Sequence, residues 1–343
     1  MQKHVTINQV AKDAGVSIQT VSRVINNRYD VAPETRQRVQ AAIDRLGYQP
    51  NAIARGLASH RSRTLGLITY DFNDYSFTQV VTGAEAEAHK SGYFFMLGNA
   101  SCDPQDEPKY LRLLTERHVE GVLFARQGNQ DDLEHLLDLQ INGVPVVTTG
   151  YHRPGRPFAM VDVNNQEGGQ KATACLLNNG HTHIATITGP LNSQSAGDRM
   201  QGYRQALNAA GIAFQPELVA EGDYSHRSGY QAMQQLLAVG HPFTALFAQN
   251  DRMAIGAICA LQEAGWRVPG DISVVGYDDI PEAEFSNPPL TTIRQPMVEV
   301  GAAAARLLIT MIENPDATPE QVLFETELIR RSSETPYQGN RVS

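Results

Sequence analysis

Residues 10–26 read VAKDAGVSIQTVSRVIN, and this stretch decides the fold of the amino-terminal part of the chain. Gly15 can take the left-handed conformation that ends a helix, and Ser17 can accept the hydrogen bond that starts the next one. The pattern therefore predicts two short helices joined by a tight turn, the second over residues 18–26.

The flanking residues extend this pattern to three helices. Residues 6–9, TINQ, fit a capping box, in which the Thr hydroxyl and the Gln side chain satisfy free amides at a helix start. Downstream, Pro33 near a first turn and Gly47 at an end bound a third helix. Its apolar residues recur at i, i+4 and i+7 as Val39, Ile43 and Leu46. The three helices can close one small core.

The second predicted helix has one apolar and one polar face. Val21, Val24 and Ile25 form the inward face. On the outward face, Gln can pair with adenine and Arg with guanine in the major groove, whereas Ser and Thr at a helix start suit phosphate. The candidate DNA contacts in this region are Thr6, Ser17, Ile18, Gln19, Thr20, Ser22, Arg23 and Asn26.

Charge is distributed unevenly along the 343 residues. The formal net charge is -9, yet residues 1–63 contain ten Lys and Arg against four Asp and Glu, so the negative excess lies in residues 64–343. A small basic module on a large acidic body favours polyanion binding at the amino-terminal end. A merely solvated basic face is the alternative interpretation.

Length and cysteine content narrow the class of protein. At roughly 150 residues per domain, the chain is long enough for two domains with large cores. Cys102, Cys175 and Cys259 lie outside any CxxC pattern, so we expect buried thiols of a cytosolic protein without a metal or redox role. The chain has no run of about 18 apolar residues and no signal-peptide pattern, which predicts a cytoplasmic, nucleoid-associated protein without membrane contact.

Residues 10–17, VAKDAGVS, and residues 20–26, TVSRVIN, resemble the DNA-binding headpiece of the lactose/galactose-repressor (LacI/GalR) family of bacterial transcriptional regulators. In that family the helix-turn-helix lies in the major groove of the operator. A short hinge helix follows it and inserts a Leu wedge into the minor groove, which unstacks base steps and kinks the duplex.

Residues 51–58, NAIARGLA, resemble this hinge helix. The DNA contacts that the resemblance implies here are Asn51, Arg55 and Leu57, with Leu57 as the wedge. The alternative is that residues 51–63 form only a linker.

From residue 64 onward, apolar runs alternate with helix-length segments. The runs cover residues 64–70, 93–98, 121–124, 144–149, 184–188, 244–248 and 273–276. This alternation predicts an α/β fold of parallel sheets flanked by helices. Two such units are needed to use the remaining residues, and the resemblance implies a two-lobed, periplasmic-binding-protein-like core of doubly wound sheets.

The expected domain boundaries follow from these patterns. An all-α helix-turn-helix headpiece takes residues 1–49, and a hinge helix with its linker takes residues 50–62. The amino-terminal lobe of the effector core takes residues 63–163 and 293–322. The carboxy-terminal lobe takes residues 164–292 and 323–333, and a tail takes residues 334–343.

Polar side chains follow three of the apolar runs. Asn250 and Asp251 follow one run, Asp278 and Asp279 follow another, and Arg199 opens the helix after a third. Ligands of open α/β sheets bind beyond the carboxyl ends of the strands. Carboxylate, guanidinium and carboxamide together suit a polyhydroxylated ligand, because each offers paired donors or acceptors to adjacent hydroxyls. Helix capping explains Asp251 and Asp279 at least as well.

The later part of the chain carries the same resemblance. The family's effector-core motifs are similar to residues 189–191, 198–203, 250–256, 273–279 and 287–295. The resemblance implies that Arg199, Asn250 and Asp278 bind the effector while Tyr224 stacks on it, as in the sugar-binding rather than the purine-binding members. The lactose-repressor branch is the most similar, although Met297 replaces an aromatic of its pocket wall.

An aromatic ring could cover the apolar face of a sugar. Tyr224 and Phe77 are the two candidates for this role. The complete set of candidate effector contacts is Phe77, Ser195, Arg199, Tyr224, Asn250 and Asp278.

The sequence offers little support for a metal or catalytic site. His181 and His183 flank Thr182, but two histidines on a strand need further ligands to hold a metal. The pair at residues 168–169, GG, is too isolated for a phosphate loop, and no G-x-S-x-G or P-loop pattern occurs. No nucleophile stands at a diagnostic spacing from a base, so we expect neither enzyme activity nor a cofactor.

We therefore predict a ligand-responsive repressor that binds a pseudo-palindromic operator as a homodimer. Gln19 and Ile18 are expected to specify bases, and Arg23 to contact guanine or phosphate. A sugar, with a galactoside as one option, would bind between the lobes and change DNA affinity through reciprocal coupling. Residues 334–343 hold no heptad, which favours a dimer over a tetramer.

Two other functions compete with this prediction. A sugar-binding transport or chemotaxis receptor could share the two-lobed body, but the basic headpiece and the lack of a signal peptide count against it. An enzyme acting on nucleosides or sugars would need a catalytic pair, and the sequence presents none at a diagnostic spacing.

Overall fold

The computed structural model describes residues 5–48, 61–69, 74–100, 106–125, 136, 139–140, 142–150 and 158–339. The chain divides into two compact units, Met1–Arg63 and Thr64–Ser343. We refer to the first unit as the headpiece and to the second as the core.

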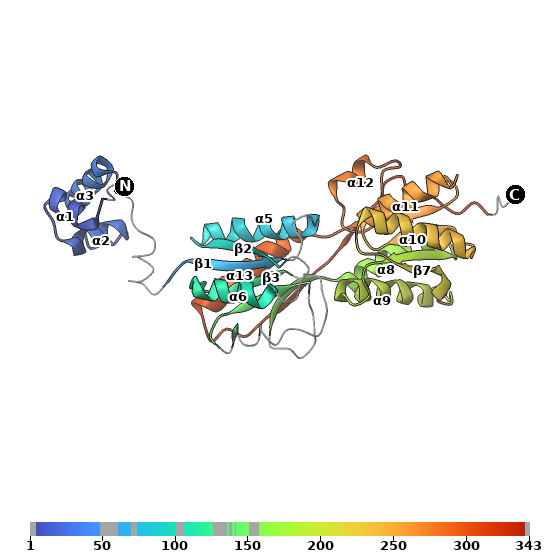
Figure 1. Ribbon diagram of the computed structural model, residues 1–343, viewed down its shortest axis with the longest axis horizontal. Coiled ribbons are helices and arrows are strands. Elements are labelled where there is room, and N and C mark those ends of the chain that lie inside the picture. Colours follow the sequence, from blue (N-terminus) through green and yellow to red (C-terminus); the bar gives the residue numbers. More distant parts are fainter. Residues whose placement is uncertain are drawn as a thin grey trace. The chain divides into compact units, whose positions relative to one another are not determined.

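The headpiece is a three-helix unit, as predicted (Figure 1). Its helices are α1 (Ile7–Ala14), α2 (Ile18–Ile25) and α3 (Pro33–Leu46). Gly15 ends α1 with a φ of 64°, which a residue with a side chain adopts only under strain. This turn is what allows α2 to fold back against α1 after only three intervening residues.

The ends of the headpiece helices carry the predicted caps. The Gln9 side chain accepts a hydrogen bond from the Thr6 amide at 2.8 Å, as in a capping box. The Ser17 hydroxyl accepts from the Thr20 amide at 3.1 Å. The buried residues that form the headpiece core are Val10, Ala11, Ala14, Val21, Val24, Val39 and Ala42.

The core contains two parallel sheets. The first has the strand order β11-β5-β4-β3-β1-β2. Its strands are β1 (Thr64–Thr69), β2 (Phe94–Asn99), β3 (Val122–Ala125), β4 (Val146–Thr149), β5 (Ala159–Val163) and β11 (Gln321–Phe324). Every neighbouring pair is parallel, as expected for strands joined through helices.

Helices cover both faces of this first sheet (Figure 1). They are α5 (Tyr75–Lys90), α6 (Asp106–Glu116) and α13 (Met297–Glu313). Alternate side chains of β1 point to opposite faces: Leu65 and Leu67 pack with α5 and α13, whereas Ile68 packs on the side of α6. This lobe therefore has two hydrophobic layers around one sheet.

The second sheet has the strand order β7-β6-β8-β9 and is parallel throughout. Its strands are β6 (Ile184–Thr188), β7 (Val219–Glu221), β8 (Ala245–Ala248) and β9 (Ser273–Val275). Its helices are α8 (Asn165–Asn178), α9 (Gln194–Ala209), α10 (His226–Val239) and α11 (Asp251–Glu263). The first two cover one face and the last two cover the other. A short 3-10 turn, Pro216–Leu218, precedes β7, and the short helix α12 (Pro281–Phe285) follows β9.

The chain crosses between the two sheets by three connections. The first runs from β5 directly into α8. The other two form a separate antiparallel ribbon of β10 (Thr292–Arg294) and β12 (Glu327–Ile329). Between β10 and β12 the chain returns to the first sheet as α13 and β11.

Some sequence expectations differ from the structure. Because Leu323 and Phe324 pair with β5, the first lobe extends two residues beyond the expected limit of 322. Cys175 is buried as expected, but Cys259 is exposed, because it lies on the outer face of α11. Cys102 lies outside the described residues. Within the described part, no helix combines the length and apolarity required to cross a bilayer.

Candidate DNA interface and effector site

The predicted DNA contacts lie on the exposed side of the headpiece helices. Among the residues described there, Thr6, Ser17, Ile18, Gln19, Arg23 and Asn26 are exposed, while Thr20 and Ser22 are half-buried. Ile18 leaves 48% of its surface open although it is apolar. An exposed apolar residue beside an exposed Gln is compatible with contact to a thymine methyl group and an adenine edge.

Several of these side chains have partners inside the headpiece. The hydroxyls of Ser17 and Thr20 lie 2.9 Å apart, and Asn26 donates to the Ser22 hydroxyl at 3.4 Å. Gln19 has no hydrogen-bond partner among the described residues, so its amide is free for an external contact. The predicted hinge contacts Asn51, Arg55 and Leu57 lie outside the described residues.

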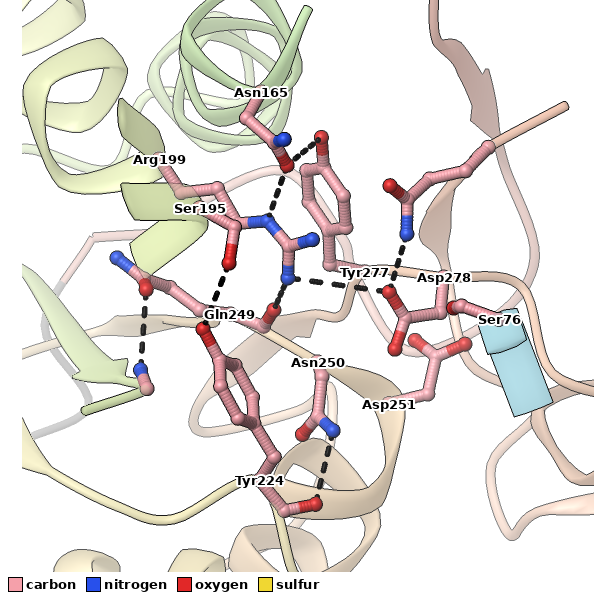
Figure 2. A network of polar contacts seen from close by, with 12 residues as sticks. Ser76, Asn165, Ser195, Arg199, Tyr224, Gln249, Asn250, Asp251, Tyr277 and Asp278 are labelled. Atoms are coloured by element: carbon pink, nitrogen blue, oxygen red, sulfur yellow. Dashed lines mark hydrogen bonds and ion pairs between the residues drawn. The ribbon is translucent and has the colours of Figure 1, made fainter. Parts of the chain in front are cut away.

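The second sheet assembles a polar cluster from the carboxyl ends of all its strands (Figure 2). Arg199 lies on α9 after β6, Tyr224 follows β7, Asn250 follows β8 and Asp278 follows β9. Carboxyl ends of parallel strands meet at one edge, which explains why residues far apart in sequence come together here. Ser195 joins them from the first turn of α9.

Arg199 is the centre of this cluster and is only 2% exposed. Its Nε donates to Asn165 Oδ1 at 2.8 Å, and its Nη1 donates to the Gln249 carbonyl at 2.5 Å. The guanidinium carbon lies 3.8 Å from the centroid of the Tyr277 ring, a cation–π arrangement. Nη2 has no partner among the described residues and remains available to a ligand.

Asp278 supplies the carboxylate next to this guanidinium. Its Oδ1 accepts from Gln295 Nε2 at 2.7 Å and lies 3.9 Å from Arg199 Nη1. Its φ is 113°, an unusual backbone conformation for a residue with a side chain. Burial raises the pKa of Asp278 well above its usual value, and the opposing effect of Arg199 is smaller.

Asp251 lies in the same region but faces inward. Its Oδ1 accepts from the Thr292 hydroxyl at 2.6 Å, and its Oδ2 accepts from the Ile280 amide at 2.9 Å. Burial raises the pKa of Asp251 to about 7. The residue therefore ties α11 to the crossing strand β10. It does not cap the helix, as the alternative interpretation held, because the cap of α11 is Asn250.

Asn250 links two of the strand ends. Its Oδ1 accepts from the Met253 amide at 2.8 Å, and its Nδ2 donates to the Tyr224 carbonyl at 3.0 Å. Tyr224 itself has a φ of 68°. A carboxamide carries two amide hydrogens and two acceptor lone pairs, so Asn250 can hold this loop and still contact a ligand.

Three hydroxyl groups meet beside Arg199. The Tyr224 hydroxyl lies 3.1 Å from Ser193 Oγ and 3.3 Å from Ser195 Oγ, and the two serine oxygens are 3.3 Å apart. The ring of Tyr224 passes so close to Gly189 that a Cβ there would lie 2.0 Å from Cζ. The glycine is therefore required for the tyrosine to enter the cluster.

Phe77 does not join this cluster. Its ring is 7% exposed and lies in the core between α5 and the first sheet. The reason is the start of α5, where Asp74 caps the helix by accepting from the Ser76 amide at 2.8 Å and Tyr75 packs on the core of the second lobe. Phe77 is therefore a core residue and, contrary to the prediction, does not belong to the effector site.

Sequence reasoning missed the residues that hold Arg199 and Asp278 in place. They are Asn165, Gln249, Tyr277 and Gln295. Each lies within two residues of the end of a strand, so the rule that located Asn250 and Asp278 could have drawn attention to these positions too. Gln249 acts through its backbone carbonyl, which no residue-type pattern can reveal.

The histidine pair has a structural explanation. His181 is buried, with Nδ1 at 2.9 Å from the Thr244 hydroxyl and Nε2 at 3.0 Å from the Thr335 carbonyl. Burial lowers its pKa. Tyr337 packs its ring against His181, so residues of the expected tail lie against the second lobe.

Comparison with known proteins identifies both units. Residues 6–51 match the family model for bacterial regulatory proteins of the lacI family, and residues 173–334 match a periplasmic binding protein-like domain. The HTH-type transcriptional repressor PurR of Aliivibrio fischeri (strain MJ11) is 39% identical over 331 residues, covering 96% of this chain and 98% of the relative. PurR of Klebsiella pneumoniae (strain 342) is 36% identical over 329 residues, covering 96% of each.

Solved structures give the same result. The lac repressor dimer bound to operator and the anti-inducer ONPF has a TM-score of 0.89 and 31% identity, covering 97% of this chain and 100% of that one. The complex of the transcriptional regulator CelR with cellobiose has a TM-score of 0.75 and 36% identity. The match covers 96% of this chain and 100% of CelR in that structure. The chain therefore belongs to the lacI family of bacterial regulatory proteins and is a ligand-responsive transcriptional repressor rather than an enzyme.

Proposed function

We propose that this repressor is controlled by a sugar bound at the carboxyl ends of β6–β9. The observation that carries the proposal is the buried pair of Arg199 and Asp278, 3.9 Å apart. In the described part of the chain, Nη2 of the arginine and Oδ2 of the aspartate have no hydrogen-bond partner. A ligand with adjacent donor and acceptor groups satisfies both atoms at once.

Adjacent hydroxyls of a sugar have this character. Each hydroxyl donates one hydrogen bond and accepts others, so a carboxylate can take the hydrogen of one while a guanidinium donates to the oxygen of its neighbour. Asn250 adds a carboxamide, and Ser195 and Tyr224 add hydroxyls on the other side of Arg199. The half-buried Tyr224 ring can also cover an apolar sugar face.

The comparisons support a sugar without identifying it. One similar structure holds cellobiose, and a second, the lac repressor bound to ONPG, has a TM-score of 0.87 and 30% identity. The relatives that carry the name PurR make purines the competing effector class, because the family includes sugar-binding and purine-binding members.

On the DNA side, we propose that the repressor binds a pseudo-palindromic operator in the cytoplasm, at the nucleoid. Gln19 and Ile18 contact base edges, and Arg23 contacts guanine or phosphate. The remaining phosphate contacts come from Thr6, Ser17, Thr20, Ser22 and Asn26. Asn51 and Arg55 belong to a hinge in which Leu57 acts as the wedge. Two headpieces are needed to read two half-sites, which requires a homodimer.

The edge strand β2 fits this homodimer. Phe94, Met96 and Leu97 are exposed there by 61%, 37% and 48%, and an apolar sheet edge is an unfavourable surface to leave open to water. We place the contact with a second copy at this edge. Sedimentation of Phe94→Asp should then show monomers at concentrations where the wild type is a dimer, whereas Val239→Asp, at an exposed position on α10, should stay dimeric.

The effector proposal is tested by thermal unfolding of the full chain in a panel of monosaccharides, disaccharides, galactosides and purines. A ligand that binds the native state raises the midpoint by mass action. We expect a saturable rise with a sugar that is lost in Asp278→Asn and kept in Asp316→Asn, the same change at an exposed position. A rise with purines alone, or an undiminished rise in Asp278→Asn, contradicts the proposal.

A further inference from the structure

The loop between α2 and α3 places an acidic side chain beside the arginine of the DNA-binding face. Oδ2 of Asp30 lies 3.6 Å from Nη1 of Arg23, and the two side chains are 47% and 57% exposed. A carboxylate on a surface that approaches phosphates is electrostatically unfavourable for DNA binding. Such a carboxylate can instead affect how the headpiece discriminates between operator and non-operator DNA.

Asp30 is held near Arg23 by the backbone of the loop. The Arg28 amide donates to the Arg23 carbonyl at 2.9 Å, so the chain folds back over the last turn of α2. Arg36 then fastens the loop from α3, donating to the Arg28 carbonyl and, at 3.4 Å, to Asn27 Oδ1. The proximity of the two charges is thus built into the loop and does not depend on the ion pair alone.

For Arg23, this ion pair is similar in strength to a phosphate contact and weaker than a bidentate contact with a base. An exposed ion pair contributes about 0–1 kcal/mol. A bidentate contact of Arg with guanine discriminates by about 1–3 kcal/mol, so an operator guanine can draw Arg23 away from Asp30. A phosphate of unrelated DNA offers only a screened charge contact similar to the one Arg23 already has.

We propose that Asp30 is a specificity-determining residue that withholds Arg23 from the phosphates of non-operator DNA and releases it to an operator guanine. This inference rests on the proposed role of Arg23 in DNA contact. On non-operator DNA the pair neutralises one positive charge of the headpiece, whereas on the operator the arginine is engaged with a base.

The experiment compares Asp30→Asn with the wild type on two duplexes. One duplex is the sequence that the wild-type protein selects from a randomised library, and the other has the same composition in shuffled order. Binding is measured by fluorescence anisotropy with the full chain over a range of KCl concentrations. Glu34→Gln is the matched control, because it removes the same charge from an exposed headpiece position that has no ion pair with Arg23 among the described contacts.

We expect Asp30→Asn to tighten binding to the shuffled duplex by about two- to fivefold, as loss of an exposed ion pair implies, and to steepen its salt dependence by up to about 0.9 in the log–log slope. Binding to the selected duplex should change less than that, so the ratio of the two affinities falls. In an Arg23→Ala background the effect of Asp30→Asn should fall to that of Glu34→Gln, which reports the loss of one negative charge alone.

Each contrary outcome has its own meaning. If Arg23→Ala leaves the affinity for the selected duplex unchanged, the proposed DNA contact of Arg23 fails. If that affinity falls but Asp30→Asn behaves like Glu34→Gln, or changes both duplexes equally, only the selectivity role of Asp30 is overturned.

Discussion

The guanidinium of Arg199 lies over the ring of Tyr277, with its central carbon 3.8 Å from the ring centroid. Both residues are almost fully buried, so the ring stabilises a charge that water cannot reach. The Tyr277 hydroxyl donates to Asn165 Oδ1 at 3.4 Å, the same atom that accepts from Arg199 Nε at 2.8 Å. The arginine is thus positioned before any ligand arrives.

Replacing this ring should weaken effector binding. Tyr277→Leu removes the cation–π contact, and we expect the affinity for the sugar found in the thermal panel to fall by about 30-fold, since a desolvated cation–π contact is worth roughly 2 kcal/mol. Tyr277→Phe keeps the ring and should stay within about twofold of the wild type, because it loses only a long hydrogen bond. Calorimetric titration measures both, and equal losses would show that the hydroxyl rather than the ring positions Arg199.

A glycine in α8 sets the distance to the same arginine. A Cβ on Gly169 would lie 2.3 Å from the Arg199 carbonyl oxygen, so Gly169→Ala must separate α8 from α9. We expect a loss of roughly 1–3 kcal/mol in the free energy of unfolding and weaker effector binding. Gly197→Ala, on the open side of α9 with no atom within 4 Å of the added Cβ, should stabilise the protein by roughly 0.5–1 kcal/mol. Urea unfolding tests both, and a stable Gly169→Ala would contradict the close approach.

Asp162 should make stability depend on pH. Burial raises its pKa from 3.8 to about 7, so the native state binds this proton more tightly than the unfolded state does. The favourable contribution of the protonated form is complete below about pH 4 and is lost as the pH rises through about 7.

Asp162→Asn removes this titration and keeps an oxygen for the Val163 amide, which donates to Oδ1 at 2.8 Å. The variant should match the wild type near pH 4 and exceed its unfolding free energy by roughly 4 kcal/mol at most above pH 7. Urea unfolding across this range provides the measurement. A difference that does not change with pH would mean that Asp162 is ionised throughout.

Base reading by the headpiece should depend on Gln19. Gln19→Ala is expected to lower the discrimination between the selected and the shuffled duplex by about 1–3 kcal/mol, because the proposed role of the Gln19 amide is contact with a base edge. Gln40→Ala, at an exposed position on α3, serves as the control. Equal losses of affinity for both duplexes would contradict base reading and indicate that Gln19 contacts a phosphate.

The headpiece could be predicted closely because its signals are local. Thr6, Gly15, Ser17, Pro33 and Gly47 each act on their immediate neighbours. Helices α1 and α3 begin and end, and α2 begins, where these residues place them, whereas α2 ends at Ile25, one residue before the predicted end. Similarly, β6 matches its apolar run at both ends. Local patterns of this kind need no knowledge of the tertiary fold.

Other elements were not predictable in this way. β5 carries Asp162 in the middle of an apolar run, and β7 has only three residues, so neither stands out as a strand. β11 lies at a sheet edge and alternates between exposed and half-buried side chains. These segments form strands because they pair with neighbouring strands of the sheet, and a local sequence pattern does not reveal that pairing.

The effector cluster was predictable where its residues follow strands and not where packing decides. Asn250 and Asp278 lie just after strands and Arg199 lies on the helix that follows one, and the structure brings the three together. The prediction of Phe77 as an effector contact was wrong because the cap at Asp74 sets the register of α5, and this register turns the Phe77 ring into the core. A periodic pattern does not fix which way the first turn of a helix faces.

The proposed effector site takes one residue from the segment after each strand of the second sheet, and this arrangement has an evolutionary consequence. Each of β6, β7, β8 and β9 ends in its own loop, so a substitution in one loop alters one contact and leaves the other three supported by separate backbones. Descendants of such a scaffold can exchange one effector for another stepwise, without passing through an unfolded intermediate. The sheet stays the same among such descendants, while the loops that follow its strands change in sequence and in the ligand they bind.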